Sequence, residues 1–266
     1  MRYNLHMSWA SRRRTSYTTG VILFFAVVIG GPLMYWYLSV PPTCSDGIQN
    51  QGETSVDKGG PCFVLDEKSL QPYALLWSRS FRVRDGSYNA VAYIQNPNKE
   101  AGVRSARYRF GLYDARNVLI AEREGIMYIM PGATTPVIEA RIDAGNRIVA
   151  HTYFEFTEPF TWERMKNNAT AISVSNKDIS SVAESPRLSA LAQNSSVVPL
   201  TDISFVAVVF DPAGNAFTAS ATSLSRLDAG EASEIVFTWP DPFAMQPSRL
   251  DVIPIVAPSL LTAEDY

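Results

Sequence analysis

The densest group of residues able to do chemistry is a polar stretch bounded by the chain's two cysteines, Cys44 and Cys62. Four side chains with oxygen ligands recur within it at intervals of three or four residues: Asp46, Asn50, Glu53 and Asp57. Calcium takes about six to eight oxygen ligands, which proteins supply from carboxylates, amides and backbone carbonyls. Four glycines in the stretch permit the tight turns that gathering these ligands needs. The stretch therefore predicts a calcium-binding loop, and the alternative is a polar spacer without metal.

The two cysteines follow a long apolar run, and an exported segment with two cysteines most simply pairs them. We therefore expect a Cys44–Cys62 disulfide, which would close the loop and lower the entropic cost of gathering its ligands. The chain has two histidines, His6 and His151, and no further cysteine, so its composition argues against a zinc site.

The 19 residues from Cys44 to Cys62 resemble a cysteine-rich motif of secreted and surface proteins of bacteria, C-x-D-G-x-x-N-x-x-E-x-x-x-D-C-G-G-x-C. The resemblance implies a calcium-binding-like loop. By this resemblance, the four oxygen-bearing residues named above would be the calcium ligands. The sequence departs from the motif at Lys58, where the pattern has a third cysteine. This departure removes a second disulfide and brings a positive charge into the loop.

Four arginines form a second candidate group, and each alternates with apolar residues along a predicted strand. They are Arg82, Arg84, Arg107 and Arg109. We expect them to share the solvent face of one sheet. There they would bind an anionic glycan, lipid head groups or the acidic strand of a protein partner. The alternative is a solvated strand face with cross-strand charge pairs.

Catalytic motifs are missing from the sequence. His151 is the only histidine after the apolar run, and it lies in an apolar strand pattern, so we expect it to be a structural or surface residue. The sequence has no Gly-x-Ser-x-Gly elbow, no P-loop and no dinucleotide fingerprint. We therefore expect a protein that is not an enzyme. A tethered hydrolase is the weaker alternative.

The element that fixes the position of all these groups is residues 21–40, an uncharged run that is long enough to cross a membrane as a helix. Four arginines precede it, and the first acidic residue is Asp46. Positive charge stays on the cytoplasmic side, so we expect a single-pass protein with its N-terminus inside and lipid around residues 21–40. Cleaved signal peptides have shorter apolar runs and small residues at the cleavage site. Here Tyr35, Trp36 and Tyr37 stand at the far end, which favours a retained anchor.

The part after the anchor is acidic. Four of the 23 basic residues precede residue 41 and all 26 acidic residues follow it, which leaves a net charge of −7 for the remainder. A nucleic-acid-binding domain needs a basic surface, so we expect no nucleic-acid partner.

Alternating apolar and polar residues predict that this part is mainly β. In residues 105–114 every second residue is apolar, the period of a half-buried strand. Residues 203–211 align with this segment when Asp211 is matched to Asp114. Asn-containing breaks precede both segments, and glycine turns follow both. We interpret this order as an internal duplication of one β-sandwich.

The Phe-Gly-Leu-Tyr-Asp of residues 110–114 resembles the FxLYD domain, an immunoglobulin-like module of bacterial surface proteins and lipoproteins. The resemblance covers about 90 residues and implies a fold and a surface location, with the Asp capping a turn. We expect two tandem immunoglobulin-like β-sandwiches after one transmembrane helix. The expected divisions are a basic cytoplasmic tail (1–20), the helix (21–40), the disulfide-closed loop (41–66) and two sandwiches (67–165 and 166–266).

These expectations favour a protein of the cell envelope, anchored in the cytoplasmic membrane, with a structural or binding module outside it. Its partner would be an envelope protein or a glycan. The alternative is an accessory subunit of an export or pilus-like assembly.

Overall fold

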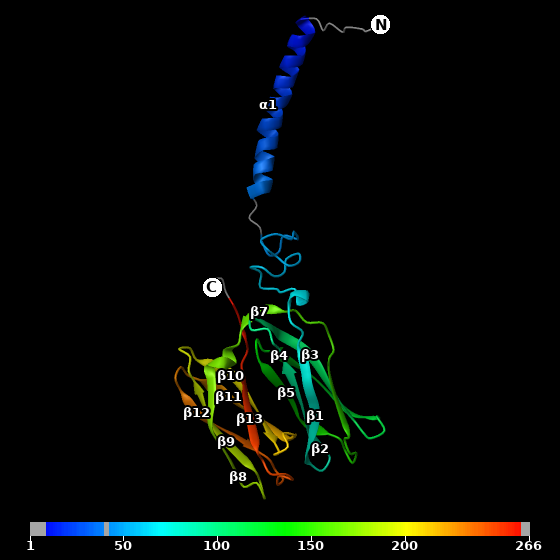
Figure 1. Cartoon of the computed structure of the whole chain (residues 1–266), viewed down its shortest axis with the longest axis vertical. Coiled ribbons are helices and arrows are strands. Elements are labelled where there is room, and N and C mark those ends of the chain that lie inside the picture. The colour runs from blue at the N-terminus through cyan, green and yellow to red at the C-terminus, as the bar shows by residue number, and fades with distance from the viewer. Residues whose placement is uncertain (1–8, 40–42, 262–266) are drawn as a thin grey trace.

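The computed structural model describes residues 9–39 and 43–261. Helix α1 (Trp9–Ser39) stands apart from a folded β-rich body (Figure 1). Its segment Arg12–Trp36 is long and apolar enough to cross a membrane. The helix begins before the predicted start at residue 21, so part of the predicted basic tail is helical. Pro32 lies inside it without ending it, which membrane helices tolerate.

The first half of the body contains seven strands. They are β1 (Ala74–Arg84), β2 (Ser87–Gln95), β3 (Ala101–Tyr113), β4 (Leu119–Ile129), β5 (Thr134–Asp143), β6 (His151–Phe156) and β7 (Glu163–Lys166). The short 3-10 helix η1 (Glu67–Ser69) precedes them.

The second half repeats this order after the 3-10 helix η2 (Asn168–Ala171). Its strands are β8 (Ile172–Ser180), β9 (Arg187–Asn194), β10 (Leu200–Phe210), β11 (Ala216–Leu227), β12 (Ala232–Thr238), β13 (Arg249–Ile255) and β14 (Ser259–Leu260).

The two halves have the same strand connectivity. In the first, one sheet has the order β1-β2-β5, and β3 pairs with β4 and β6 in the other. In the second, the sheets are β8-β9-β12 and β11-β10-β13, which are the same positions in the repeat. All of these pairings are antiparallel. The mainly β fold with sandwich-type packing agrees with the prediction, and the matching topology supports the predicted duplication.

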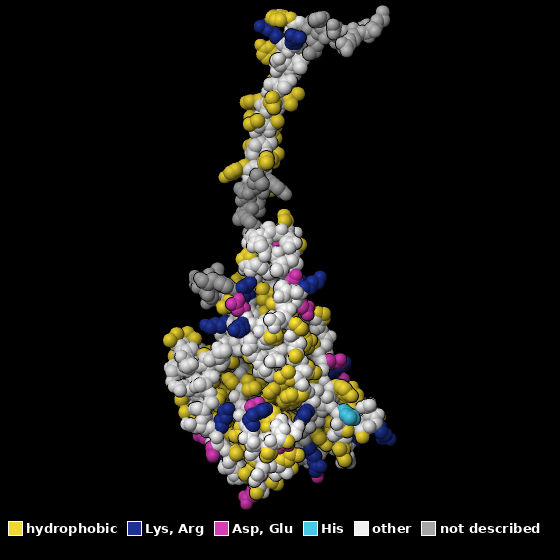
Figure 2. All heavy atoms as spheres, viewed as in Figure 1, with side chains coloured by type: hydrophobic (Ala, Val, Ile, Leu, Met, Phe, Trp, Pro, Cys, Tyr) yellow, Lys and Arg dark blue, Asp and Glu magenta, His cyan; other side chains and the backbone are white. Residues whose placement is uncertain are grey.

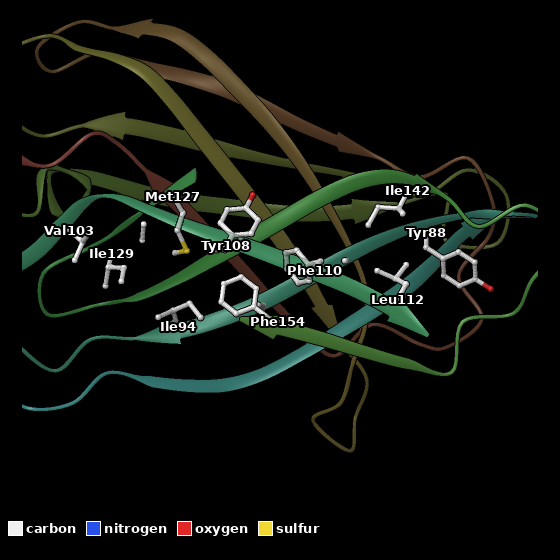
Figure 3. Packing of buried hydrophobic residues seen from close by; sticks show 14 of the residues in the cluster. Tyr88, Ile94, Val103, Tyr108, Phe110, Leu112, Met127, Ile129, Ile142 and Phe154 are labelled. Atoms are coloured by element: carbon white, nitrogen blue, oxygen red, sulfur yellow. The ribbon is translucent and has the colours of Figure 1, made fainter. Parts of the chain in front are cut away.

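Each half encloses its own apolar core between its two sheets. Side chains from β2 and β3 meet in the first core, where Phe110, Leu112 and Ile94 are fully buried (Figure 3). Phe205, Val209 and Leu188 are fully buried in the second core, where Val209 holds the position of Leu112. The alternation seen in the sequence arises because every second residue of these strands faces a core.

A third apolar layer joins the halves. The outer face of sheet β1-β2-β5 packs against the outer face of sheet β11-β10-β13. Its buried members are Phe81, Val91, Tyr93, Val206, Val208, Phe210, Ala216 and Ala219. Asn89 adds a hydrogen bond across this layer, from its Nδ2 to the carbonyl oxygen of Ala219 at 3.0 Å. The body is therefore a stack of four sheets with three buried layers between them.

The end of the described chain returns to the first half. Strand β14 pairs with β7, which pairs in turn with β3. The predicted boundary at residue 166 therefore does not separate the halves cleanly, since β14 belongs to the second range and extends a sheet of the first. This closure brings the end of β14 close to the loop that follows the anchor (Figure 1).

Candidate functional site

The loop after the anchor contains the predicted disulfide. Cys44 and Cys62 are joined, with their Cα atoms 5.5 Å apart. Cys62 is buried and Cys44 is exposed. The disulfide thus closes the loop that carries the polar side chains.

Asp46 organises the first turn of the loop. Its carboxylate accepts hydrogen bonds from the backbone N–H groups of Thr43 (3.0 Å) and Ile48 (2.8 Å) and from Nδ2 of Asn50 (2.9 Å). The bond from Thr43 is the largest cause that lowers the pKa of Asp46 below 3.8, followed by the bond from Asn50. Asp46 and Asn50 are therefore brought together as predicted.

Glu53 and Asp57 hold the rest of the loop. Oε2 of Glu53 accepts from the backbone N–H groups of Asn50 (3.3 Å) and Asp57 (3.2 Å), and its side chain is buried. The Asp57 carboxylate accepts from the N–H of Gly47 at 3.2 Å. The four predicted residues thus belong to one hydrogen-bond network, in which Asp46 and Asn50 are joined directly and the others through backbone N–H groups. Among the described residues, the carboxylates of Asp46, Glu53 and Asp57 do not form a group of ligand atoms within 4.8 Å of one another.

Two oxygens in this network lack a hydrogen-bond donor among the described residues. Oδ1 of Asn50 is buried without a partner. Oε1 of Glu53 lies 3.2 Å from Sγ of Cys62, but a disulfide sulfur carries no hydrogen to donate. The close group of Cys44, Glu53 and Cys62 is for the same reason not a thiolate metal site. Oxygen acceptors without donors fit a hard cation such as calcium.

Lys58, which departs from the bacterial motif, is exposed, and within the described ranges no ion pair holds its ammonium group. Its backbone forms a small bridge with Ser55. The positive charge expected inside the loop therefore points to solvent. The candidate metal ligands of the loop are oxygen atoms.

The loop is fixed to the first sandwich through β7. Nη2 of Arg164 donates to the carbonyl oxygen of Gly60 at 2.7 Å, and the Arg164 backbone N–H donates to that of Phe63 at 2.7 Å. Leu65 donates to the carbonyl oxygen of Trp162 at 2.8 Å. The disulfide loop is therefore part of the body and not a free tether.

The four arginines do not share one sheet, so that expectation is wrong. Arg82 and Arg84 lie on β1, whereas Arg107 and Arg109 lie on β3 in the opposite sheet of the sandwich. Both pairs alternate with apolar residues, but on β1 the apolar Phe81 packs in the layer between the sandwiches, and Arg82 lies opposite Tyr88 of the first core. Alternation separates the two faces of a strand and does not show which face meets the core. It also does not show which strands are neighbours.

Three of these arginines form ion pairs with nearby carboxylates. Arg82 pairs with Asp85 at the β1–β2 turn. Arg107 lies 3.3 Å from Glu158. Arg109 pairs with Glu155 on β6 and lies 3.5 Å from Glu122 on β4. The Arg109 pairs are cross-strand pairs, and the side chains of all three arginines are accessible to solvent, which fits the alternative of a solvated face. Figure 2 shows basic and acidic side chains interspersed over the visible face of the body.

A groove between the two sandwiches was not anticipated from the sequence. Its volume is about 620 Å³, and strands β4 and β5 of the first half and β10 and β11 of the second line it. Ile126 and Val206 form part of its apolar surface, and Arg104 and Ser204 are among its polar residues. The available signal was the uninterrupted apolar run of residues 205–210, which is typical of a strand buried on both faces.

No protein-family model matches the sequence, and no curated protein sequence matches it. Among the solved structures that resemble this chain, three illustrate how weak the likeness is. The red sea bream transglutaminase has 10% identity over 69% of this chain, with a TM-score of 0.23. A β-glucuronidase of Bacteroides uniformis has 14% identity over 67%, with a TM-score of 0.18. The chain spans 31% of the transglutaminase and 23% of the β-glucuronidase.

The third is the tandem CBM22 domain of Xyn10C from Paenibacillus barcinonensis. It has 9% identity over 74% of this chain and 93% of its own length, with a TM-score of 0.16. Similarity at these levels carries no argument about the chemistry of this chain.

Proposed function

We propose that this chain is a single-pass protein of the cell envelope whose β-sandwich body is an extracytoplasmic structural or binding module. The N-terminus lies in the cytoplasm in this proposal, because arginines cluster before the apolar segment. A disulfide on the other side of that segment is consistent with export to an oxidising compartment. The role is not enzymatic, because the sequence carries no nucleophile–base motif.

The observation that carries the proposal is the direct docking of the disulfide loop on the first sandwich. Backbone and side-chain hydrogen bonds from Arg164 hold the loop, and three residues separate its first described residue, Thr43, from the end of α1. A body attached so closely to an anchor stays near the bilayer and keeps its far end free. That arrangement suits a protein that presents a surface to envelope components.

Membrane fractionation tests the anchor and its direction. Full-length protein should remain in the membrane fraction after alkaline extraction, and protease added to the extracytoplasmic side should remove the part after residue 42. Val27→Arg should weaken retention, because a central charge costs about 2.5 to 3.5 kcal/mol during helix insertion. Ser16→Arg, before the apolar run, serves as the matched control and should be retained. Recovery of the wild-type protein in the soluble fraction, or protection of its body from external protease, would refute the proposal.

We also propose that the loop binds calcium, with ligands from Asp46, Asn50, Glu53 and Asp57. The buried Asn50 Oδ1 without a donor supports this second element. Extracellular calcium modules bind at about 10⁻⁴ to 10⁻³ M. Full-length protein in lipid nanodiscs should therefore release or absorb heat when titrated with calcium in this range. Calcium should also slow proteolysis between Cys44 and Cys62.

Two variants sharpen the calcium test. Asp46→Asn removes one charged ligand and should weaken binding, whereas Asp143→Asn, at the exposed end of β5 in the first sandwich, should leave it unchanged. Absence of heat up to about 10 mM calcium, well above the expected affinity range, together with unchanged proteolysis, would leave the loop as a disulfide-closed spacer.

A further inference from the structure

A cluster of aromatic and charged side chains lies on the outer face of the first sandwich, away from both the anchor loop and the inter-sandwich groove. Strand β3 runs through its middle, paired with β4 on one side and β6 on the other. The pairing register places Gly111 opposite Glu122 on β4 and Tyr153 on β6. A residue without a side chain therefore sits between a carboxylate and an aromatic ring.

Two tyrosines form the apolar part of this cluster. The Tyr113 ring folds over Gly111, since a Cβ atom at Gly111 would come within 2.7 Å of the ring carbon Cε2. Tyr153 meets Tyr113 edge to face, with ring centroids 5.2 Å apart and an interplanar angle of 87°. Tyr153 is 55% exposed although it is held by this contact. The result is an aromatic surface that faces solvent and loses little conformational freedom when a ligand binds.

Polar groups surround the rings. Arg109 lies between Glu122 and Glu155 and forms ion pairs with both. Asn117, in the left-handed conformation at φ 58°, completes the rim from the β3–β4 turn. Together these residues line a depression of about 500 Å³. An apolar surface with a few convergent polar groups is the usual composition of a small-molecule site.

The charges and the backbone pairing restrict the chemical class of ligand that can bind here. One guanidinium faces two carboxylates, so the depression has a net negative charge and repels anions. The floor strand β3 is paired on both sides, so a peptide cannot add a strand there. Carboxylate, guanidinium and amide groups around an aromatic face suit a ligand with C–H groups on one side and hydroxyl groups at its edge. A neutral carbohydrate has this chemistry.

We propose that the cluster of Arg109, Tyr113, Asn117, Glu122, Tyr153 and Glu155 binds a neutral carbohydrate, with a sugar ring stacked on Tyr153. This inference rests on the proposed function, because it gives the extracytoplasmic module a ligand class. Strand β3 leads from β7, beside the anchor loop, to this cluster at its other end. The site therefore faces away from the membrane, where an envelope or surface glycan can reach it.

The test uses full-length protein in lipid nanodiscs, titrated calorimetrically with cellohexaose, maltohexaose and chitohexaose, and with oligogalacturonate as an anionic probe. We expect saturable binding of at least one neutral oligosaccharide and weaker or no binding of oligogalacturonate. Tyr153→Ala should reduce the affinity by about tenfold, which corresponds to about 1.4 kcal/mol. Tyr153→Phe keeps the ring and should retain most of the affinity.

Val197→Ala is the matched control, because Val197 is an exposed apolar residue of the second sandwich, 92% accessible, and should leave binding unchanged. The inference is overturned by absence of binding to every neutral probe at millimolar concentration, by equal affinity in Tyr153→Ala, or by a preference for oligogalacturonate. If the protein is retained in membranes but binds no neutral probe, the carbohydrate inference fails and the proposed anchor function stands. Loss of membrane retention would contradict the proposed function whatever the titration shows.

Discussion

Two buried asparagines, Asn96 and Asn194, hold the chain by hydrogen bonds at equivalent corners of the two sandwiches, where strands end and the chain turns. Nδ2 of Asn96 donates to the carbonyl oxygens of Ala101 (2.7 Å) and Met130 (3.0 Å). Nδ2 of Asn194 donates to those of Leu227 and Asp228, both at 3.1 Å. Each amide satisfies backbone carbonyls where a chain turn leaves the sheet ladder. Conversion to an apolar residue would leave these carbonyls buried without donors.

Asn96→Ala and Asn194→Ala should therefore each reduce the free energy of unfolding by about 1 to 3 kcal/mol or more, the cost of unpaired buried polar groups. Chemical denaturation of the full-length protein in detergent measures this change. Asn146→Ala, at an exposed turn, is the control and should stay within about 0.5 kcal/mol of wild type. Equal stability of all three variants would show that the corner bonds do not matter.

Asp114 caps the turn after β3. Oδ1 accepts from the backbone N–H groups of Arg116 and Val118, both at 2.9 Å, and Oδ2 accepts from Arg147 at 2.7 Å. The Val118 bond, followed by the Arg147 bond, lowers the pKa of Asp114 from 3.8 to about 2. Because the folded pKa is below the unfolded one, the stabilisation is complete above pH 3.8 and is lost as the pH falls toward 2.

Replacement of Asp114 by Asn should remove this pH-dependent contribution. Denaturation midpoints measured between pH 6 and pH 2 should therefore fall less steeply for Asp114→Asn than for wild type. Arg147→Ala is the comparison variant. It should keep most of the dependence, because the backbone bonds are retained. Parallel pH profiles for Asp114→Asn and wild type would contradict this assignment.

At the scale of elements, strands β3 and β10 occupy equivalent places but have different outer faces. Both direct alternate residues into a core, where Leu112 and Val209 are fully buried. On the outer face, Arg109, Gly111 and Tyr113 of β3 align with Val206, Val208 and Phe210 of β10, which belong to the layer between the sandwiches. The outer face of this strand therefore meets solvent in the first repeat, as β3, and is buried between two sheets in the second, as β10.

Leu112→Ala should lower the free energy of unfolding by about 2 to 5 kcal/mol, the range for large-to-small changes in a packed core. Val209→Ala removes fewer atoms, so its cost should lie toward the lower end, at about 2 kcal/mol. Urea denaturation measures both. The exposed Val197→Ala should change stability by less than about 0.5 kcal/mol. Comparable values for all three would mean that these strands do not form the cores.

At the scale of the whole molecule, the repeats stack in the same direction. The β1-β2-β5 sheet of the first covers the sheet of the second that corresponds to β4-β3-β6. Both outermost faces carry charged or polar side chains. Arg107 and Arg109 lie on one, and Arg187 and Gln193 lie on the other.

Because the middle layer is apolar, the two sandwiches should unfold together in one transition. Val208→Asp places a charge in this layer without entering either core, and an unpaired buried charge costs about 3 to 5 kcal/mol. This variant should show two thermal transitions and faster proteolysis in the segment between the sandwiches. Thr201→Asp, at an exposed position of the same strand, is the control. A single unchanged transition in Val208→Asp would show that the layer does not couple the halves.

The sequence by itself determined the features that depend on nearby residues. The uncharged run predicted the helix, the two cysteines predicted their disulfide, and alternation identified core residues such as Leu112. The duplication was visible because Asp114 and Asp211 cap turns, and Asn96 and Asn194 fix corners, in the same order. The apolar helix, the alternation and the turn caps are local signals, since a short stretch of chain contains the atoms that cause each of them. The disulfide followed instead from the presence of only two cysteines, and the duplication from the same order of signals in both halves.

Only the tertiary structure decided which strands are neighbours. From alternation we expected Arg82 and Arg109 to face solvent, but alternation could not show that they lie in opposite sheets of the sandwich. It also gave no sign that β14 would pair with β7, or that Gly111 would lie between Glu122 and Tyr153. These juxtapositions join residues that are distant in the chain. They depend on the total apolar area that the stacked sheets bury together, a quantity that no short segment contains.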